Sequence, residues 1–190
     1  MTRKTSADLA REFESFVAAN AGDLLRAGYL VLFDLGAAED VVQECLVKVA
    51  RRWPRVAGMD HPAAYARRIV VRDAVRAAER RQHERLELRA GPGVADVTAD
   101  AASDRELRGV DARADLIPLL RGLPARQRAV LTLRFFEDLT EAQTAKALGC
   151  SVGTVKSTTS RALERLRNQL ATGGDGATDD ARGTTSHELT

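Results

Sequence analysis

The sequence predicts an all-α protein made of two small helical domains joined by a flexible linker. Aromatic residues make up only 4% of its 190 residues, and charged residues make up 29%. Apolar residues recur mostly three or four positions apart, as on one face of a helix, and strand-like alternation is scarce. Between two such regions lies a stretch rich in Ala, Gly, Asp, Ser and Thr, which is too weakly apolar to form a core. We therefore place the domains at residues 9–89 and 111–170, with the linker over 90–110 and a disordered tail over 171–190.

The first domain begins with two predicted helices. The first helix covers 9–33, and Asp34-Leu35-Gly36 is expected to break it. The second helix covers 37–53 and has an apolar residue at every fourth position from Val41 to Trp53. Polar residues occupy much of its other surface, so this helix is expected to bury one face and expose the other.

A third helix is predicted from Pro62 to about Arg85, because proline suits the first turn of a helix. From Arg67 to Arg85 the chain has seven arginines and three acidic residues. Four arginines of this helix stand four positions apart and share one face: Arg68, Arg72, Arg76 and Arg80. Such a basic ridge on one helix favours an anionic partner.

The second domain is predicted to start with a short apolar helical segment. Apolar residues crowd positions 116–123, and Pro124 starts a further helix that contains Phe135. Thr140, with Gln143 three positions later, is a capping-box pattern, in which each side chain meets one unpaired amide at the start of a helix. Another helix is therefore predicted to begin at Thr140.

Three residues after this cap have the spacing of a helix-turn-helix. Ala145 is small enough to let two helices cross closely, and Gly149 supplies turn geometry that residues with side chains resist. Val155 would anchor the second helix against the first, and in this motif the second helix enters the major groove of DNA. An ordinary amphipathic helix with a solvated basic face is the alternative, and the motif spacing favours DNA binding.

The candidate DNA contacts lie on the second helix of this motif. If Val155 and Ala162 face inward, the hydroxyl and basic residues between them lie on or beside the outward face. Ser, Lys and Arg side chains suit both base edges and phosphates. The candidates are Thr154, Lys156, Ser157, Ser160, Arg161 and Arg165. For three further arginines, phosphate contact and plain solvation both stay open: Arg126, Arg128 and Arg134.

Several classes of function find no support in the sequence. Cys45 and Cys150 are expected in helix packing, and His61, His83 and His187 are scattered, so neither a metal site nor a cofactor is expected. An enzyme would need clustered carboxylates, or a nucleophile with a base, and neither is found. No signal peptide is visible and no apolar run approaches the roughly 18 residues of a membrane span. We therefore expect a cytoplasmic protein without membrane insertion.

Three segments resemble the extracytoplasmic-function (ECF, group 4) sigma factors of the sigma-70 family. Residues 123–167 are similar to region 4 of these proteins, through LPARQRAVLTLRFFEDLTEAQTAKALGCSVGTVKSTTSRALERLR. Residues 38–53, AEDVVQECLVKVARRW, are similar to region 2.2, and residues 61–81, HPAAYARRIVVRDAVRAAERR, to regions 2.3–2.4. The resemblance covers roughly 9–89 and 111–170. Frequent Ala and Arg with few Lys also indicates a GC-rich bacterial genome and the actinobacterial SigE-like branch.

This resemblance implies an RNA polymerase sigma factor. Such a protein binds core polymerase, places its two domains on the −35 and −10 promoter elements, and helps to melt the duplex. The resemblance implies that Asp40, Gln43 and Glu44 contact the coiled coil of the β′ clamp, and that region 4 meets the β flap. An acidic and amide face can complement a basic coiled coil. An anti-sigma factor is a further partner that the resemblance implies, with no residue assigned to it.

The resemblance also assigns the −10 element to the third helix and to the loop before it. The loop would hold a flipped base, and the arginines would hold phosphates of the opened strand. Arg72 and Asp73 stand where many relatives have Asn and a small residue, so the preferred −10 sequence is expected to differ. The candidates for this contact are Met59, Asp60, His61, Arg67, Arg68, Arg72 and Arg76.

The main alternative is a helix-turn-helix regulator that binds promoter DNA without acting as a sigma subunit. GTVK followed by a basic helix also occurs in the output domains of response regulators. No receiver-like alternation of strands and helices precedes the motif, however, and the segment from Asp40 to Glu44 would have no role in such a protein. The residues therefore favour a sigma factor.

Overall fold

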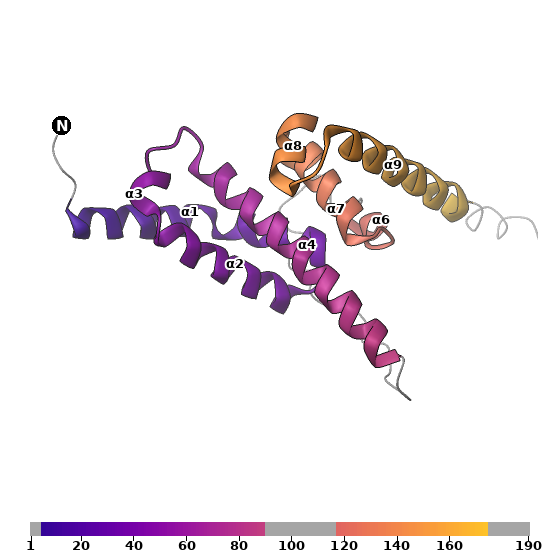
Figure 1. Ribbon diagram of the computed structural model, residues 1–190, viewed down its shortest axis with the longest axis horizontal. Helices are drawn as coiled ribbons and strands as arrows, with labels where there is room; N and C mark the ends of the chain where they lie inside the picture. The colour runs from indigo at the N-terminus through magenta and orange to yellow at the C-terminus, as the bar shows by residue number, and fades with distance from the viewer. Residues whose placement is uncertain (1–4, 90–116, 175–190) are drawn as a thin grey trace, which may run out of the picture.

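The computed structural model describes residues 5–89 and 117–174, and every regular element within these ranges is a helix (Figure 1). The predicted all-α class is thus confirmed, while the predicted linker lies outside the described residues. The N-terminal domain contains α1 (Ser6–Leu32), α2 (Leu35–Ala50), the short α3 (Trp53–Val56) and α4 (Pro62–Arg89). The C-terminal domain contains α6 (Ile117–Arg121), α7 (Ala125–Leu131), the π-helix η3 (Thr132–Phe136), α8 (Glu141–Leu148) and α9 (Val152–Gly174).

Side-chain caps set the start of the first two helices. Thr5 and Asp8 form a capping box at α1, in which the Asp8 amide donates to the Thr5 hydroxyl at 3.2 Å. α1 ends at Phe33, which is left-handed at φ 50°. Asp34 then caps α2 by accepting a hydrogen bond from the Ala37 amide at 2.8 Å. The break is therefore shorter than the predicted Asp34-Leu35-Gly36, because Asp34 is the N-cap of α2 and the helix begins at Leu35.

α1, α2 and α4 pack against one another and enclose the core of the N-terminal domain. The four-residue repeat of α2 is buried as predicted: Cys45 and Val49 are inaccessible, and Val41 and Trp53 are 7% and 5% exposed. Trp53 starts α3 instead of ending α2, however, and Pro54 follows it. Proline lacks the N–H group that a continuing helix would use, so α2 stops short of the predicted end.

The two cysteines are expected to differ in thiol reactivity. Cys45 is fully buried with its Sγ 3.5 Å from the carbonyl oxygen of Ala66, and burial, followed by the charge of Asp73, raises the pKa of its thiol to about 12. Cys150 is partly exposed. With an aromatic disulfide reagent at about pH 8, we expect one accessible thiol, lost in Cys150→Ser, and a second that reacts only on unfolding. Two accessible thiols in the folded chain would contradict this packing.

The C-terminal domain departs from the predicted helices at two places. The single helix expected through Phe135 is instead α7 followed by η3, in which the Glu137 amide donates five residues back to the Thr132 carbonyl at 3.0 Å. At the other end, α9 continues through Gly174, so the start of the predicted tail is helical. The remainder of that tail lies outside the described residues.

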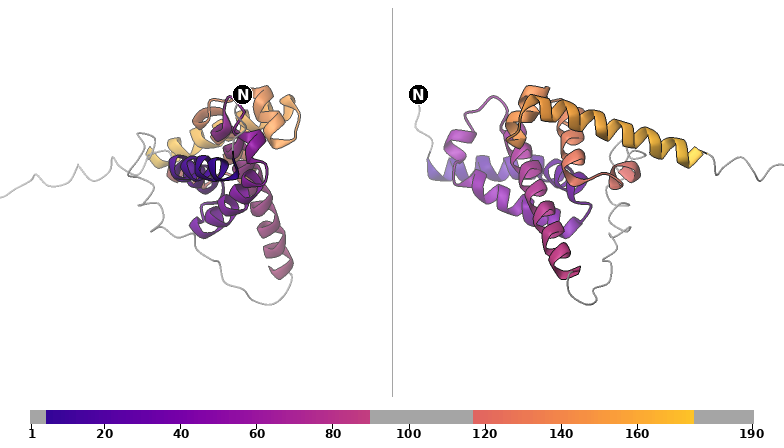
Figure 2. Two further views of the ribbon diagram at one scale, coloured as in Figure 1. Left: turned by 90° about the vertical axis from the view of Figure 1, so that its left-hand side faces the viewer. Right: turned by 45° about the vertical axis from the view of Figure 1, so that its right-hand side comes forward.

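The two domains pack directly against each other, an arrangement that the sequence left open (Figure 2). α7 contacts both α1 and α4, and α8 contacts α4. Leu30 and Phe33 share a buried cluster with Leu123, Leu131 and Ala162 of the C-terminal domain. The apolar core therefore continues from one domain into the other, while the end of α9 projects beyond the other helices.

Candidate functional site

A stripe of exposed side chains runs along the outer face of α2. Asp40, Gln43 and Glu44 are all exposed, and they border one shallow surface hollow together with Val47. Val47 is 50% exposed, although it is a large apolar residue. We call these four residues the α2 stripe. Sequence reasoning missed Val47, although its position three residues after Glu44 places it on the same face. Lys48 and Arg51 border the same hollow, so the apolar side chain lies among acidic, amide and basic groups, a mixture that suits a protein-binding surface.

The loop between α3 and α4 exposes two of its three candidate residues. Asp60 and His61 are exposed, whereas Met59 is partly buried against the core of the N-terminal domain. The Met59 amide also donates to the Val56 carbonyl at 3.0 Å, which turns the main chain back toward α3. Met59 therefore packs at the start of the loop, and Asp60 and His61 are the more exposed of the three candidates.

α4 carries the basic ridge. Arg76 is exposed, and Arg68 and Arg72 are half-buried. Arg72 and Arg76 both pair with Asp73, at 3.3 and 3.7 Å. The side chain of Asp73 is only 10% exposed, so an enclosed carboxylate lies at the base of the ridge. Sequence reasoning noted Asp73 as a departure from relatives and gave it no role.

Arg67 points to the C-terminal domain instead. Its side chain is 23% exposed and makes a close ion pair with Glu137, and a longer one with Asp23 of α1 at 3.7 Å. Burial raises the pKa of Glu137, although Arg67 acts in the opposite direction. The structure thus engages Arg67 between the domains, away from the four arginines of the basic ridge.

α8 and α9 form the helix-turn-helix that the spacing predicts. The capping box of Thr140 and Gln143 starts α8, and Gly149 ends it in the left-handed region at φ 66°. Val155 is fully buried in a cluster with Ala145, which is 5% exposed. The residue types expected to hold the two helices together therefore do so, and glycine is needed at the turn because a β-carbon disfavours this φ.

The outward face of α9 carries the candidate DNA contacts. Ser151 caps the helix, since its hydroxyl accepts a hydrogen bond from the Thr154 amide at 3.1 Å. Arg161 donates from Nε to the carbonyl oxygen of Ser157 at 3.2 Å, which holds its guanidinium along the helix. Thr154 is half-buried, and the exposed candidates are Lys156, Ser157, Ser160, Arg161 and Arg165.

The three arginines left open between phosphate contact and solvation have different environments. Arg128 is half-buried and turned toward the N-terminal domain: it donates from Nε to the carbonyl oxygen of Val31 in α1 at 2.7 Å, and from another nitrogen to that of Leu123. Arg134 likewise donates to a main-chain carbonyl within its own domain. Arg126 is exposed. Nothing in the sequence around Arg128 distinguished it, because its partner lies in the other domain.

The described residues contain neither a metal cluster nor a membrane span. Within 5–89 and 117–174, no group of three or more His, Cys, Asp or Glu side chains is placed to hold a metal ion. In the same two ranges, no helix combines the length and the apolar character needed to cross a bilayer.

Two parts of the chain match known families. Residues 16–84 match sigma-70 region 2, and residues 113–166 match sigma-70 region 4. Over 159 residues the chain is 35% identical to the RNA polymerase sigma-E factor of Streptomyces avermitilis, covering 84% of this chain and 85% of that protein. Over 150 residues it is 32% identical to the ECF RNA polymerase sigma factor SigD of Mycobacterium tuberculosis, covering 73% and 66%.

A solved structure shares the fold. The co-crystal structure of the sigma factor RpoE with the anti-sigma factor NepR from Bartonella quintana aligns with a TM-score of 0.62, covering 85% of this chain and 98% of the matched chain. At 23% identity, this likeness supports the fold alone. The sequence relatives match along most of the chain at more than 30% identity, so they identify the family as well as the fold. The chain belongs to the sigma-70 family and is an RNA polymerase sigma factor of the ECF group, similar to the sigma-E factors of Streptomyces.

Proposed function

We propose that the chain is a dissociable initiation subunit that binds core RNA polymerase, directs it to promoters and then leaves. One observation carries this proposal: the exposed α2 stripe, with its acidic, amide and apolar side chains, and the basic faces of α4 and α9 lie on three different helices of one chain. DNA binding alone would not require the α2 stripe. The polymerase supplies the chemistry of RNA synthesis, so the chain itself acts without a catalytic group or a cofactor.

The α2 stripe is the proposed contact with the coiled coil of the polymerase β′ clamp. Asp40 and Glu44 would face basic groups of that coiled coil, and the exposed Val47 would be covered on binding. In the C-terminal domain, Phe135 of η3 is 44% exposed and offers an apolar surface to the β flap. Two contacts on the polymerase would hold both domains of the chain.

The two basic faces are the proposed DNA contacts. α9 would lie in the major groove of the −35 element, with Lys156, Ser157 and Arg161 near bases and phosphates. Asp60, His61 and the outward arginines of α4 would hold the opened strand at the −10 element, which favours melting without ATP. Each face alone would bind weakly, and the pair gains affinity when the polymerase fixes their separation.

An anti-sigma factor is the proposed negative regulator. The fold relative from Bartonella quintana was crystallised with the anti-sigma factor NepR. The surfaces that bind polymerase would also serve such an inhibitor, since either partner would cover the exposed Val47 and Phe135. Because the polymerase and its promoters are cytoplasmic, we place the protein in the cytoplasm.

Reconstituted transcription tests this proposal. The purified chain is tagged and mixed with core RNA polymerase from the same organism, and run-off transcripts are then mapped on genomic fragments. We expect capture of the polymerase together with start sites that core polymerase alone does not use. A folded, inhibitor-free chain that captures no polymerase but binds DNA on its own would indicate a helix-turn-helix regulator instead.

Removing one basic side chain from α9 is expected to weaken DNA binding and to reduce its salt dependence. Each lost phosphate contact lowers the slope of log K against log salt concentration by about 0.9. We expect this for Lys156→Ala and for Arg161→Ala, measured by titrating promoter DNA with the holoenzyme at several salt concentrations. Arg11→Ala removes an equal charge from exposed surface on α1 and serves as the control. Unchanged slopes in both α9 variants would contradict the assignment of this face.

A further inference from the structure

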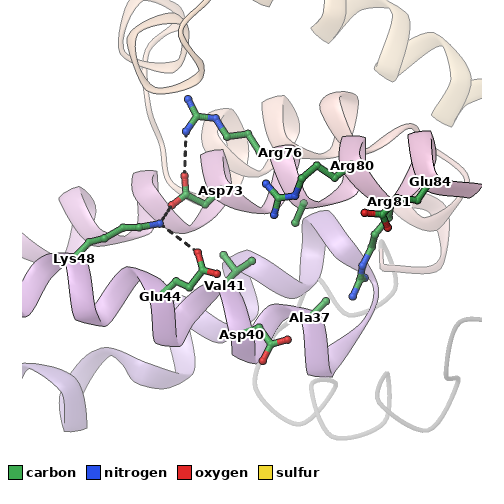
Figure 3. Close-up of a pocket in the computed structure, with 11 residues that line it drawn as sticks. Ala37, Asp40, Val41, Glu44, Lys48, Asp73, Arg76, Arg80, Arg81 and Glu84 are labelled. Carbon is green, nitrogen blue, oxygen red and sulfur yellow. Dashed lines mark hydrogen bonds and ion pairs between the residues drawn. The ribbon is translucent and has the colours of Figure 1, made fainter.

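A groove of about 350 Å³ lies between α2 and α4 (Figure 3). Its charged lining residues are Asp40, Glu44 and Lys48 from α2, with Asp73, Arg76, Arg80, Arg81 and Glu84 from α4. Acidic and basic groups are therefore mixed along the groove instead of forming one patch of a single sign. Neither the α2 stripe nor the basic ridge explains why a carboxylate lies between them.

Asp73 is held by three cations. Its side chain is 10% exposed, and Oδ2 accepts a hydrogen bond from Nζ of Lys48 at 2.9 Å. Oδ1 lies 3.3 Å from Nε of Arg72 and 3.7 Å from Nη1 of Arg76. Enclosing a carboxylate is costly unless cations and hydrogen-bond donors pair with it, and these three partners do so. Two of the three partners belong to the basic ridge, so the carboxylate restrains the groups that face the nucleic acid.

Lys48 extends this network to the α2 stripe. Its Nζ lies 3.4 Å from Oε2 of Glu44, in addition to its contact with Asp73 (Figure 3). The hydrogen bond from Lys48 to Asp73 is the main reason why the pKa of Lys48 is raised. Ion pairs therefore join the proposed polymerase contact to the proposed −10 contact.

We propose that Asp73 is a positioning and specificity-determining residue for recognition of the −10 element. It holds the guanidinium groups of Arg72 and Arg76 in place on α4, and it offsets one positive charge of the ridge. This inference rests on the proposed function, because it requires that the ridge contacts promoter DNA.

The two effects of Asp73 act in the same direction on specificity. An arginine that is already held loses less conformational entropy when it binds, so its contact with a matching site becomes more favourable. A carboxylate beside the ridge weakens the attraction for any phosphate backbone, and that attraction is independent of sequence. Asp73 therefore favours promoter DNA over non-promoter DNA.

Asp73→Asn keeps the shape of the side chain and removes its charge. Each variant is assembled with core polymerase and assayed for run-off transcription from a promoter fragment that the wild type uses, and for affinity to a promoter-free duplex of equal length. We expect transcription to fall about fivefold or more, while affinity for the promoter-free duplex rises about twofold or more. Glu84→Gln removes one negative charge from an exposed position of the same helix and is expected to keep wild-type transcription.

The variant Lys48→Met distinguishes two roles of Asp73: holding the arginines in position, and simply linking α4 to α2 through Lys48. This variant cuts the link between the helices and leaves Arg72 and Arg76 beside Asp73, so it is expected to keep the preference for promoter DNA. Because Lys48 also pairs with Glu44 of the α2 stripe, the comparison is made at saturating core polymerase, and the readout is the preference for promoter DNA over the promoter-free duplex. If Lys48→Met loses this preference as Asp73→Asn does, the carboxylate is only a helix tie and the proposal is overturned. A parallel fall in promoter and promoter-free binding in Asp73→Asn overturns it as well.

The positioning can also be measured without polymerase. In the full chain with 15N-labelled arginine, the Nε–H signal of Arg72 is assigned by its loss in Arg72→Lys. We expect slow solvent exchange for this signal in the wild type and fast exchange in Asp73→Asn. Equal exchange rates would overturn the positioning role even for an active sigma factor. If the wild type fails to capture polymerase, the proposed function is overturned, and the role of Asp73 in promoter preference is overturned with it. The exchange measurement distinguishes that outcome, because it tests the positioning of Arg72 alone.

Discussion

Reversing two charges on the α2 stripe, with Asp40→Arg and Glu44→Arg in one chain, is expected to abolish the capture of core RNA polymerase. Both side chains are exposed, so the fold does not depend on burying them. The double variant would place positive charges against a basic partner, and like charges that face each other across an interface weaken binding strongly. We expect the apparent Kd to rise at least about 100-fold in titrations of fluorescently labelled chain with core polymerase.

The matched control makes the same charge change elsewhere. Glu14→Arg/Glu164→Arg alters two exposed glutamates on other helices, α1 and α9. This control is expected to bind polymerase like the wild type, which would exclude net charge as the cause. Circular dichroism should show the same helical content in all three proteins. Wild-type affinity in the folded Asp40→Arg/Glu44→Arg chain would remove the α2 stripe as the polymerase contact.

Arg128→Ala is expected to lower the free energy of unfolding by about 2–4 kcal/mol. Its guanidinium donates to the carbonyl oxygen of Val31 at 2.7 Å and also to Leu123, and it lies 5.1 Å from the centre of the Phe33 ring. The substitution leaves two carbonyl oxygens without this donor and removes a cation from the C-terminal end of α1, where the helix dipole favours one. Chemical denaturation followed by circular dichroism measures the loss.

The same substitution is expected to uncouple the two domains. Burial, followed by the charge of Arg121, lowers the pKa of Arg128 to about 10, so its side chain is still charged at neutral pH. Arg128→Ala therefore removes a charged hydrogen-bond donor from the interface between the domains. Unfolding should then separate into two transitions, one for each domain. Arg126→Ala, at an exposed position of the same helix, removes only a solvent-exposed ion pair with Glu79 of α4 at 3.7 Å, so its free energy of unfolding should stay within about 1 kcal/mol of the wild type. One unchanged transition in Arg128→Ala would show that the contact contributes little to stability.

Local signals account for the features that could be predicted. The capping box at Thr140 and the turn at Gly149 depend on residues only a few positions apart, so the helix-turn-helix could be recognised without the structure. The exposure of Asp40 and Glu44 follows from the same local rule, because the buried repeat of α2 places them on the opposite face. The π-helix escaped prediction, since its residues are as compatible with an ordinary helix.

The sequence by itself determined the helical class, the helix-turn-helix and the faces that are acidic or basic. Only the tertiary structure decided which of the cations are already paired. Arg67 and Arg68 are adjacent in the chain, yet Arg67 is engaged with Glu137 of the other domain. Arg128 likewise has its partner, Val31, in a helix far away in sequence. Periodicity places a side chain on a face, but an ion pair or hydrogen bond depends on distance in space, which only the packing of the two domains sets.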